Sequence, residues 1–325
     1  MKIQAFGATD LQVSQLGLGC ARIGGIFKHT ASEFIELLNE ARGLGINFFD
    51  TADMYSQGES EQLLGRAFRR RRQDIVIASK VGYILPGQRR LIARIKPFVR
   101  PLIRLLRVKR SLLPAVVSGT PSQSFEPNYI RSAVEGSLRR LRTDYLDILQ
   151  LHSPPVEVVE RGDWLSALEQ LRAAGKTRYY GISCDTMAAA KAALNVPGVS
   201  CLQLVVNLFE RSMAEEITVE AKRRGIAVIA RECLANGVLA KAAGEIDLNR
   251  YCSTPEQAAE RQLALQTYRA QAQQRGLTLS ALALEYATAV EGVSVTLIGA
   301  SRTTQLRNTF QSYQSLNARS AQQRA

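Results

Sequence analysis

The chain has 325 residues, 46% of them hydrophobic and 22% charged, and its formal net charge is +13. This composition excludes a disordered chain, and because no apolar run approaches the length of a membrane-spanning helix, we expect a cytoplasmic protein. The charge alone would suit nucleic-acid binding, but nine basic residues and no Asp or Glu lie between Gly82 and Phe125. Subtracting these nine leaves +4 for the rest of the chain, so we expect no nucleic-acid partner.

The chain begins with a predicted β-hairpin, whose strands lie at Ile3–Phe6 and Leu11–Ser14. Short β-rich runs follow it and alternate with amphipathic stretches of helical periodicity. The eight predicted strands are Leu16–Cys20, Asn47–Thr51, Ile75–Lys80, Leu146–His152, Tyr179–Ser183, Leu202–Asn207, Ala227–Arg231 and Val295–Gly299. The predicted helices are Ser32–Arg42, Glu59–Arg69, Asn128–Leu141, Trp164–Ala174, Met187–Leu194, Ala214–Arg224, Ser280–Ala289 and Thr304–Tyr313.

The alternation of strands and helices predicts a parallel sheet, because parallel strands need a crossover connection. Eight such units favour closure into a barrel over an open sheet. No GxGxxG motif follows the first barrel strand, so a dinucleotide-binding Rossmann fold is not indicated. We therefore predict a single α/β domain over residues 1–325, a (β/α)8 TIM barrel with an N-terminal β-hairpin and long βα-loop insertions.

Two stretches are longer than ordinary βα loops. Asn236–Gly276 contains a helical pattern at Pro255–Arg275, and the basic insertion, about residues 82–127, contains regularly spaced apolar side chains between its arginines. These apolar residues are Leu91, Ile95, Phe98, Leu102 and Leu105. We predict that the basic insertion is a partly helical cover over the substrate mouth; disorder, a weak contact with an anionic membrane and a contact with an acidic partner are the alternatives.

Four proton-handling or charged side chains come at or just after the ends of three successive predicted strands: Asp50 and Tyr55, then Lys80, then His152. Because the carboxyl ends of parallel strands meet at one face of a barrel, we expect these side chains to lie together. An ammonium beside a phenol favours the phenolate, so Lys80 would lower the pKa of Tyr55, and Asp50 would keep Lys80 charged. His152 would hydrogen-bond the Tyr55 oxygen or a substrate carbonyl. The pattern predicts a general acid beside an oxygen that becomes an alkoxide.

These residues also lie in motifs that resemble those of the aldo-keto reductase family, in order and over nearly the whole chain. The matching segments are residues 49–52 and 55–65, Ser79 with Lys80, residues 147–152, residues 181–183, Gln203 with Asn207 and Arg211, and residues 298–302. The resemblance implies that Asp50, Tyr55, Lys80 and His152 form a catalytic tetrad, with Tyr55 as proton donor. It also implies a hydride from NADPH and a small-molecule carbonyl substrate, and it specifies no oligomeric state.

The resemblance further implies a cofactor site in the second half of the chain. Ser183 and Gln203 would bind the nicotinamide amide, and Arg231 stands where an aromatic residue often stacks on the ring. The loops after the seventh and eighth strands would hold the ribose and phosphates; their candidate residues are Leu234, Gly237, Gly299, Ser301, Arg302 and Gln305. Ser301 and Arg302 suit a 2′-phosphate, which favours NADP over NAD. Cys184, Gln305, Asn308 and Thr309 depart from residues that are common in the family, so NAD stays possible.

Metal binding is not expected, since the two histidines lack HxH or HExxH spacing and the five cysteines lack CxxC spacing. The leading interpretation is an NADPH-dependent reductase of aldehydes or ketones. One alternative is an alcohol or aldose dehydrogenase that works in the oxidative direction. Another is a cofactor-binding regulatory barrel like the channel-associated members of the family, which would have less need of His152.

Overall fold

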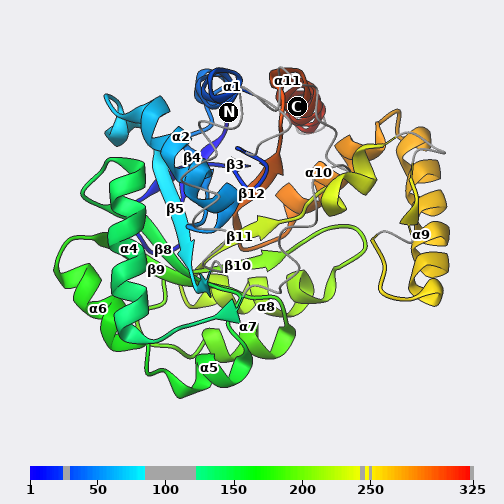
Figure 1. Cartoon of the computed structure of the whole chain (residues 1–325). Helices are drawn as coiled ribbons and strands as arrows, with labels where there is room; N and C mark the ends of the chain where they lie inside the picture. The colour runs from blue at the N-terminus through cyan, green and yellow to red at the C-terminus, as the bar shows by residue number, and fades with distance from the viewer. Residues whose placement is uncertain (25–29, 85–121, 242–245, 249–250, 323–325) are drawn as a thin grey trace, which may run out of the picture.

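The computed structural model describes residues 1–24, 30–84, 122–241, 246–248 and 251–322. Eight parallel strands close into a barrel in which each strand pairs with the next in the chain and the last pairs with the first (Figure 1). The barrel strands are β3 (Leu16–Gly19), β4 (Phe48–Asp50), β5 (Val76–Val81), β8 (Leu146–His152), β9 (Thr177–Ser183), β10 (Cys201–Val205), β11 (Ala227–Arg231) and β12 (Val293–Gly299). The predicted (β/α)8 barrel is therefore confirmed.

Helices surround the barrel and cover its strands on the outside (Figure 1). The α-helices are α1 (Ala31–Gly43), α2 (Glu59–Phe68), α4 (Pro127–Leu141), α5 (Val156–Arg161), α6 (Leu165–Ala173), α7 (Met187–Ala193), α8 (Ser212–Arg223), α9 (Pro255–Gln274), α10 (Leu279–Ala289) and α11 (Thr303–Gln322). Short 3₁₀ helices are η1 (Tyr55–Gly58), η2 (Arg72–Asp74) and η4 (Ala235–Ala240). The sequence pattern does not predict α5, because six residues are too few to show a helical period.

Helix boundaries follow from local chemistry. Thr30 and Glu33 form a capping box at the start of α1, and the side chains of Thr186, Thr254 and Thr278 accept a backbone N–H at the starts of α7, α9 and α10. After α8, Gly225 has a φ of +71°, a left-handed conformation that only glycine adopts without strain. The chain therefore turns from α8 straight into β11.

Side chains inside the barrel change from apolar to polar along the strands. An N-terminal hairpin, β1 (Ile3–Ala5) and β2 (Gln12–Ser14), is followed along one end of the barrel by a buried apolar cluster that includes Phe6, Phe48 and Ile148. Two residues farther along their strands come Asp50 and Gln150, which are buried and polar. Because alternate residues of a strand share a face, the same inward rows supply both the apolar floor and the polar site above it.

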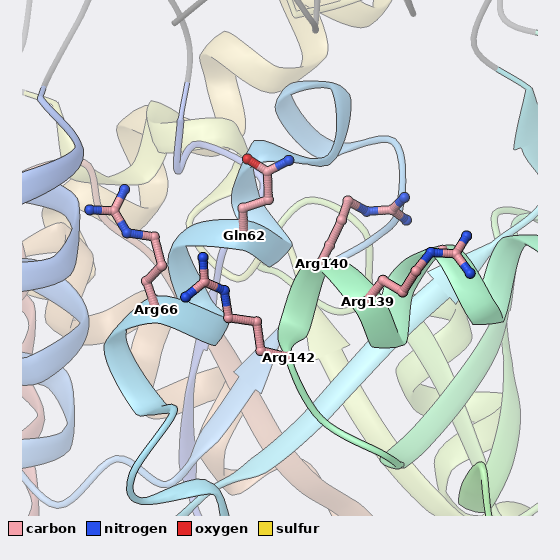
Figure 2. Close-up of a pocket in the computed structure, with 6 residues that line it drawn as sticks. Gln62, Arg66, Arg139, Arg140 and Arg142 are labelled. Carbon is pink, nitrogen blue, oxygen red and sulfur yellow. The ribbon is translucent and has the colours of Figure 1, made fainter.

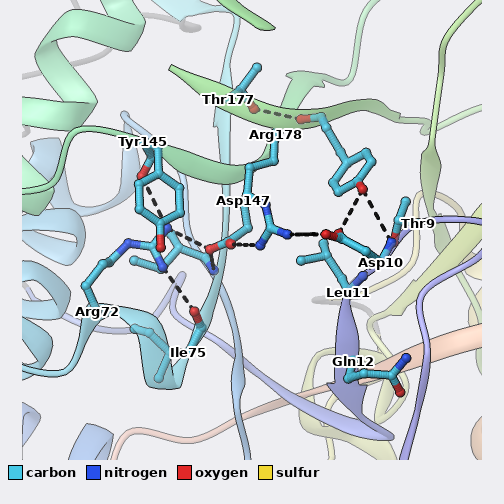
Figure 3. Close-up of polar contacts among 12 residues, drawn as sticks. Thr9, Asp10, Leu11, Gln12, Arg72, Ile75, Tyr145, Asp147, Thr177 and Arg178 are labelled. Carbon is cyan, nitrogen blue, oxygen red and sulfur yellow. Dashed lines mark hydrogen bonds and ion pairs between the residues drawn. The ribbon is translucent and has the colours of Figure 1, made fainter. Parts of the chain in front are cut away.

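A polar network fastens the hairpin to this amino-terminal end of the barrel (Figure 3). Asp147, at the start of β8, accepts hydrogen bonds from Arg72 at 2.6 Å and from Arg178 at 3.1 Å. Arg178 also donates to both carboxylate oxygens of Asp10, each at 2.8 Å, and Tyr179 donates to Asp10 at 2.8 Å. The hairpin turn, β8 and β9 are thereby joined.

The two predicted insertions have different outcomes. In the basic insertion, β6 (Tyr83–Ile84) pairs with β7 (Ser122–Gln123) in antiparallel fashion. The cover predicted for this insertion falls on residues 85–121, which lie outside the described residues. In the second insertion the predicted helix is present as α9. No helix of the described chain is long and apolar enough to cross a membrane.

Candidate active site

An ion pair between neighbouring strands lies at the centre of the site. Lys80 of β5 donates to Oδ2 of Asp50, the last residue of β4, at 2.6 Å, and to the carbonyl oxygen of Thr51 at 3.0 Å. Lys80 is completely buried. Burial by itself lowers the pKa of its ammonium, but Asp50 and Tyr55 more than offset this and raise that pKa above its ordinary value. The site therefore holds a fixed positive charge.

Tyr55 is brought to this charge by an unusual turn. It begins η1, in which Ser56, Gln57 and Gly58 have φ values of 50°, 62° and 86°. Such left-handed conformations are rare for residues other than glycine, and they mark strained turns at functional sites. The hydroxyl of Tyr55 accepts a hydrogen bond from Nζ of Lys80 at 3.4 Å.

The pKa of Tyr55 differs from the sequence-based expectation. Burial raises it above its ordinary value, and the lowering by Lys80 is present but smaller. The enclosing protein, which the sequence pattern does not reveal, is the reason. The phenol therefore keeps its proton at neutral pH, as a proton donor must.

His152 closes the other side of the site as the last residue of β8. Its ring meets the ring of Tyr55 edge to face, with centroids 5.7 Å apart, and that of Tyr83 in the same way at 4.8 Å. Burial, with the charges of Lys80 and Arg231, holds the pKa of His152 well below its ordinary value, so the imidazole is neutral. Its Nδ1 is buried and has no hydrogen-bond partner in the described chain, and the expected bond to the Tyr55 oxygen is not formed.

Two predicted cofactor residues join the same network from the next strands. Gln203 of β10 donates to Oδ1 of Asp50 at 2.7 Å, and Ser183 at the end of β9 donates to Oε1 of Gln203 at 3.4 Å. Gln150 of β8 also donates to Oδ1 of Asp50, at 3.5 Å. The carboxylate of Asp50 is thus held on both oxygens, which fixes the position of Lys80 beneath Tyr55.

Arg231 is the last residue of β11, and its Nη2 donates to the carbonyl oxygen of Cys184 at 3.5 Å. Its guanidinium pairs with Asp185 at 2.5 Å and with Glu232, and only 19% of its side chain is exposed. The Nε atom of Arg231 is buried and without a partner among the described residues. A planar, partly unsatisfied group therefore borders the site where the sequence predicts contact with a nicotinamide.

The remaining predicted cofactor residues follow β11 and β12. Leu234 precedes η4 and Gly237 lies within it with a φ of +96°, while Gly299 ends β12, where an added Cβ would meet no atom within 4 Å. Ser301 donates twice to Oε1 of Gln305, each time at 3.1 Å, at the start of α11. Arg302 is exposed. These loops lie at the same barrel end as the tetrad, with polar donors at their edge.

Several residues of the site are absent from the sequence prediction. Gln150 could have been found, because it precedes His152 by two residues on the same strand face. Asp53 has a buried Oδ1 without a partner in the described chain, and burial followed by the negative charge of Glu61 raises its pKa to about 7. Glu61 is completely buried and accepts from Ser79 at 2.6 Å and from Arg140 at 2.6 Å. Glu61 and Ser79 lie in the matching segments, but their contact with each other and with Arg140 is revealed only by the tertiary structure.

Comparison with known proteins identifies the protein family that the sequence resembles. The family model described as the aldo/keto reductase family matches residues 15–323. The chain belongs to this family. It is thus an oxidoreductase that acts on carbonyl or alcohol groups. An uncharacterized oxidoreductase of Bacillus subtilis, YqkF, is 29% identical over 319 residues, with 96% of this chain and 90% of the relative covered.

Another relative and two solved structures extend the comparison. Pyridoxal 4-dehydrogenase of Microbacterium luteolum is 27% identical over 94% of this chain and 90% of its own length. Among solved structures, the holo form of aldo-keto reductase AKR11C1 from Bacillus halodurans is 29% identical and has a TM-score of 0.75, with 96% of this chain and 91% of the other covered. The glycerol dehydrogenase AKR11B4 from Gluconobacter oxydans, at 24% identity and a TM-score of 0.74, shares the fold.

Proposed function

We propose that this aldo/keto reductase reduces an aldehyde or ketone with NADPH and that Tyr55 donates the proton. The observation that carries this proposal is the contact between the protonated phenol of Tyr55 and the buried ammonium of Lys80, beside the neutral ring of His152. A general acid must hold its proton until negative charge develops on the substrate oxygen. A positive charge must then be available to stabilise the phenolate that remains.

The residues of the site would act in sequence. NADPH, when bound, supplies the hydride. The hydroxyl of Tyr55 hydrogen-bonds the substrate carbonyl and gives up its proton as that oxygen becomes an alkoxide. Lys80, at 3.4 Å, then stabilises the phenolate, and Asp50 keeps Lys80 in place. The neutral ring of His152 would orient the carbonyl by a hydrogen bond.

The residues at the ends of β9 to β12 fit a nicotinamide nucleotide. Ser183 and Gln203 offer donors and acceptors for a carboxamide, and the buried Nε of Arg231 lacks a partner among the described residues. Leu234 and Gly237 would line the path of the pyrophosphate. The open face of Gly299 and the polar edge of Ser301, Arg302 and Gln305 would receive the adenosine end.

Substitution of Tyr55 by Phe tests the proton donor. We expect kcat for carbonyl reduction to fall about 100-fold or more, the range of a lost general acid, while the Kd for NADPH changes by no more than a few-fold. Steady-state kinetics and fluorescence titration measure the two quantities. Tyr145→Phe is the control, because the hydroxyl of Tyr145 makes no hydrogen bond within the described chain. Retention of most of the turnover by Tyr55→Phe would exclude Tyr55 as the acid.

Substitution of Arg302 by Ala tests the choice of cofactor. If its exposed guanidinium meets the 2′-phosphate, the Kd for NADPH should rise about tenfold or more while that for NADH stays nearly constant, because a charge-assisted pair to phosphate is lost. Titration of both nucleotides against wild type and variant measures this difference. Equal weakening of both cofactors would assign Arg302 to the shared part of the nucleotide or to the fold.

The oxidative direction is a second candidate function, favoured by the pyridoxal 4-dehydrogenase among the relatives. The same site serves it, with Tyr55 as the base that accepts the alcohol proton, by microscopic reversibility. Initial rates with NADPH and a panel of carbonyls, compared with NADP⁺ and the matching alcohols, separate the two directions. Faster oxidation at physiological pH across the panel would replace reduction as the proposed activity.

A further inference from the structure

We propose that the hollow between α2 and α4 binds a small free anion that carries two or more phosphate groups. Four arginines line this hollow of about 500 Å³, together with Gln62 and Gly136 (Figure 2). The arginines are Arg66 of α2, Arg139 and Arg140 of α4, and Arg142, which follows α4. None of them takes part in the proposed reaction, so the proposal is independent of it.

Arg140 is the positioned member of the group. Its Nε donates to Glu61 at 2.6 Å and its Nη2 to Ser137 at 3.1 Å, and only 27% of its side chain is exposed. Two glycines make room for it: a Cβ on Gly58 would lie 2.7 Å from Cδ of Arg140, and one on Gly136 would lie 3.0 Å from its Nη1. The guanidinium is therefore held at the wall of the hollow by the fold.

The other three arginines are exposed and lack carboxylate partners. Arg66, Arg139 and Arg142 form no ion pair or side-chain hydrogen bond within the described chain. In Figure 2 the side chain of Arg142 lies between those of Arg66 and Arg140, at one hollow. Since Glu61 offsets one of the four charges, three positive charges stay uncompensated, and like charges this close repel one another.

Several arginines elsewhere on the described surface pair with carboxylates. Arg172 at the end of α6 pairs with Glu169, and Arg223 at the end of α8 pairs with Glu220. Arg161, Arg275 and Arg307 also pair with carboxylates. A helix carboxyl end favours basic residues in general, but it does not explain why four arginines gather at one hollow with a single carboxylate partner among them.

The chemistry of the ligand follows from charge and shape. Guanidinium groups bind phosphate oxygens through paired N–H donors, and three uncompensated charges match an anion with more than one phosphate better than a single carboxylate. The arginines line an open hollow of about 500 Å³, and this volume fits a small free anion.

Calorimetric titration of the full-length protein with inorganic tripolyphosphate tests the proposal. The variant Arg66→Gln/Arg142→Gln removes two side chains that form no ion pair or side-chain hydrogen bond within the described chain, so the fold should persist, as a thermal melt would verify. We expect its Kd for tripolyphosphate to be at least tenfold weaker than that of wild type. The control variant Arg161→Gln/Arg223→Gln makes the same change in net charge at paired surface sites, and its Kd should change less than threefold.

Three outcomes would overturn the proposal. They are an equal loss in both double variants, which would mean nonspecific attraction to a basic protein, an unchanged Kd in Arg66→Gln/Arg142→Gln, and binding of sulfate or orthophosphate as tight as that of tripolyphosphate. Binding at the proposed cofactor site would be the same in both variants, so it does not enter the difference between them.

Discussion

At the scale of single residues, the site depends on where charge is buried. Asp50 and Lys80 are both buried and form an ion pair, and this pairing raises the pKa of Lys80 above its ordinary value. Asp53, only three residues from Asp50, has no cation in direct contact within the described chain and a buried Oδ1 without a partner. Its pKa is raised to about 7 by burial and by Glu61. Asp53 thus differs from Asp50 in its surroundings, because only Asp50 has a cation in direct contact.

Asp53→Asn should therefore change the dependence of stability on pH. A carboxyl whose pKa is raised on folding, here from 3.8 to about 7, disfavours the folded state once it is ionised, so wild-type stability is lost as pH rises from about 4 through 7. Asn carries no charge. We expect the gain in unfolding free energy from Asp53→Asn to be on the order of 2 kcal/mol larger at pH 8 than at pH 5.

Urea unfolding at the two pH values measures this gain. The control is Asp74→Asn, since Asp74 is exposed. If the stability difference between Asp53→Asn and wild type is the same at pH 5 and pH 8, Asp53 does not titrate in this range and the folded state holds it ionised.

At the scale of elements, the backbones of α2 and α4 approach each other closely. A Cβ on Gly65 of α2 would lie 2.3 Å from the carbonyl oxygen of Leu141, at the end of α4. The atoms that this Cβ would meet belong to the backbone of Leu141, and backbone atoms cannot change rotamer as a side chain can. This contact sets the spacing of the two helices. The spacing in turn positions Arg140 and Ser79 for the hydrogen bonds that both donate to Glu61.

Gly65→Ala should for this reason lower the free energy of unfolding by about 2 kcal/mol, the cost of overpacking a rigid contact, despite the better helix propensity of alanine. Gly43→Ala at the end of α1 is the matched control, because an added Cβ there meets no atom within 4 Å. It should leave stability unchanged or raise it by up to about 1 kcal/mol. Denaturant unfolding of both variants measures the effect, and equal stabilities would show that α4 shifts freely away from α2.

At the scale of the whole molecule, the two ends of the barrel have separate tasks. The carboxyl ends of the strands carry the tetrad and the proposed cofactor residues, whereas the opposite end holds the apolar floor beneath the hairpin. Phe6 is completely buried there, with its ring centroid 5.8 Å from that of Phe48. In barrels of this kind stability and chemistry are divided between the two faces.

Phe6→Ala should consequently destabilise the protein by about 3 kcal/mol, the cost of a large cavity in a packed core, without changing kcat. Ile3→Ala removes a side chain that is 50% exposed and should cost much less. Thermal unfolding and steady-state kinetics of the two variants, below the melting temperature of each, measure both effects. A loss of turnover in properly folded Phe6→Ala would contradict the separation of the two ends.

Much of this architecture is determined by the sequence alone. The eight strands and their alternation with helices follow from local periodicity and from glycine and threonine at helix ends, which act over a few residues. The gathering of Asp50, Tyr55, Lys80 and His152 at one face also follows, because parallel strands in a barrel bring their carboxyl ends together. The unpredicted continuation of α11 to Gln322 shows that boundaries at the polar end of a helix are less well determined.

Only the tertiary structure decided the electrostatics. Burial raises the pKa of Tyr55 although Lys80 lowers it. The pattern of hydrophobic residues in the sequence does not predict how deeply a residue after a strand is buried. In the same way, Glu61 meets Ser79 and Arg140, and Arg66 meets the end of α4, only because closure of the barrel sets α2 against α4. Desolvation and contacts between charges depend on distances between segments far apart in the chain, and those distances exist only once the barrel has closed.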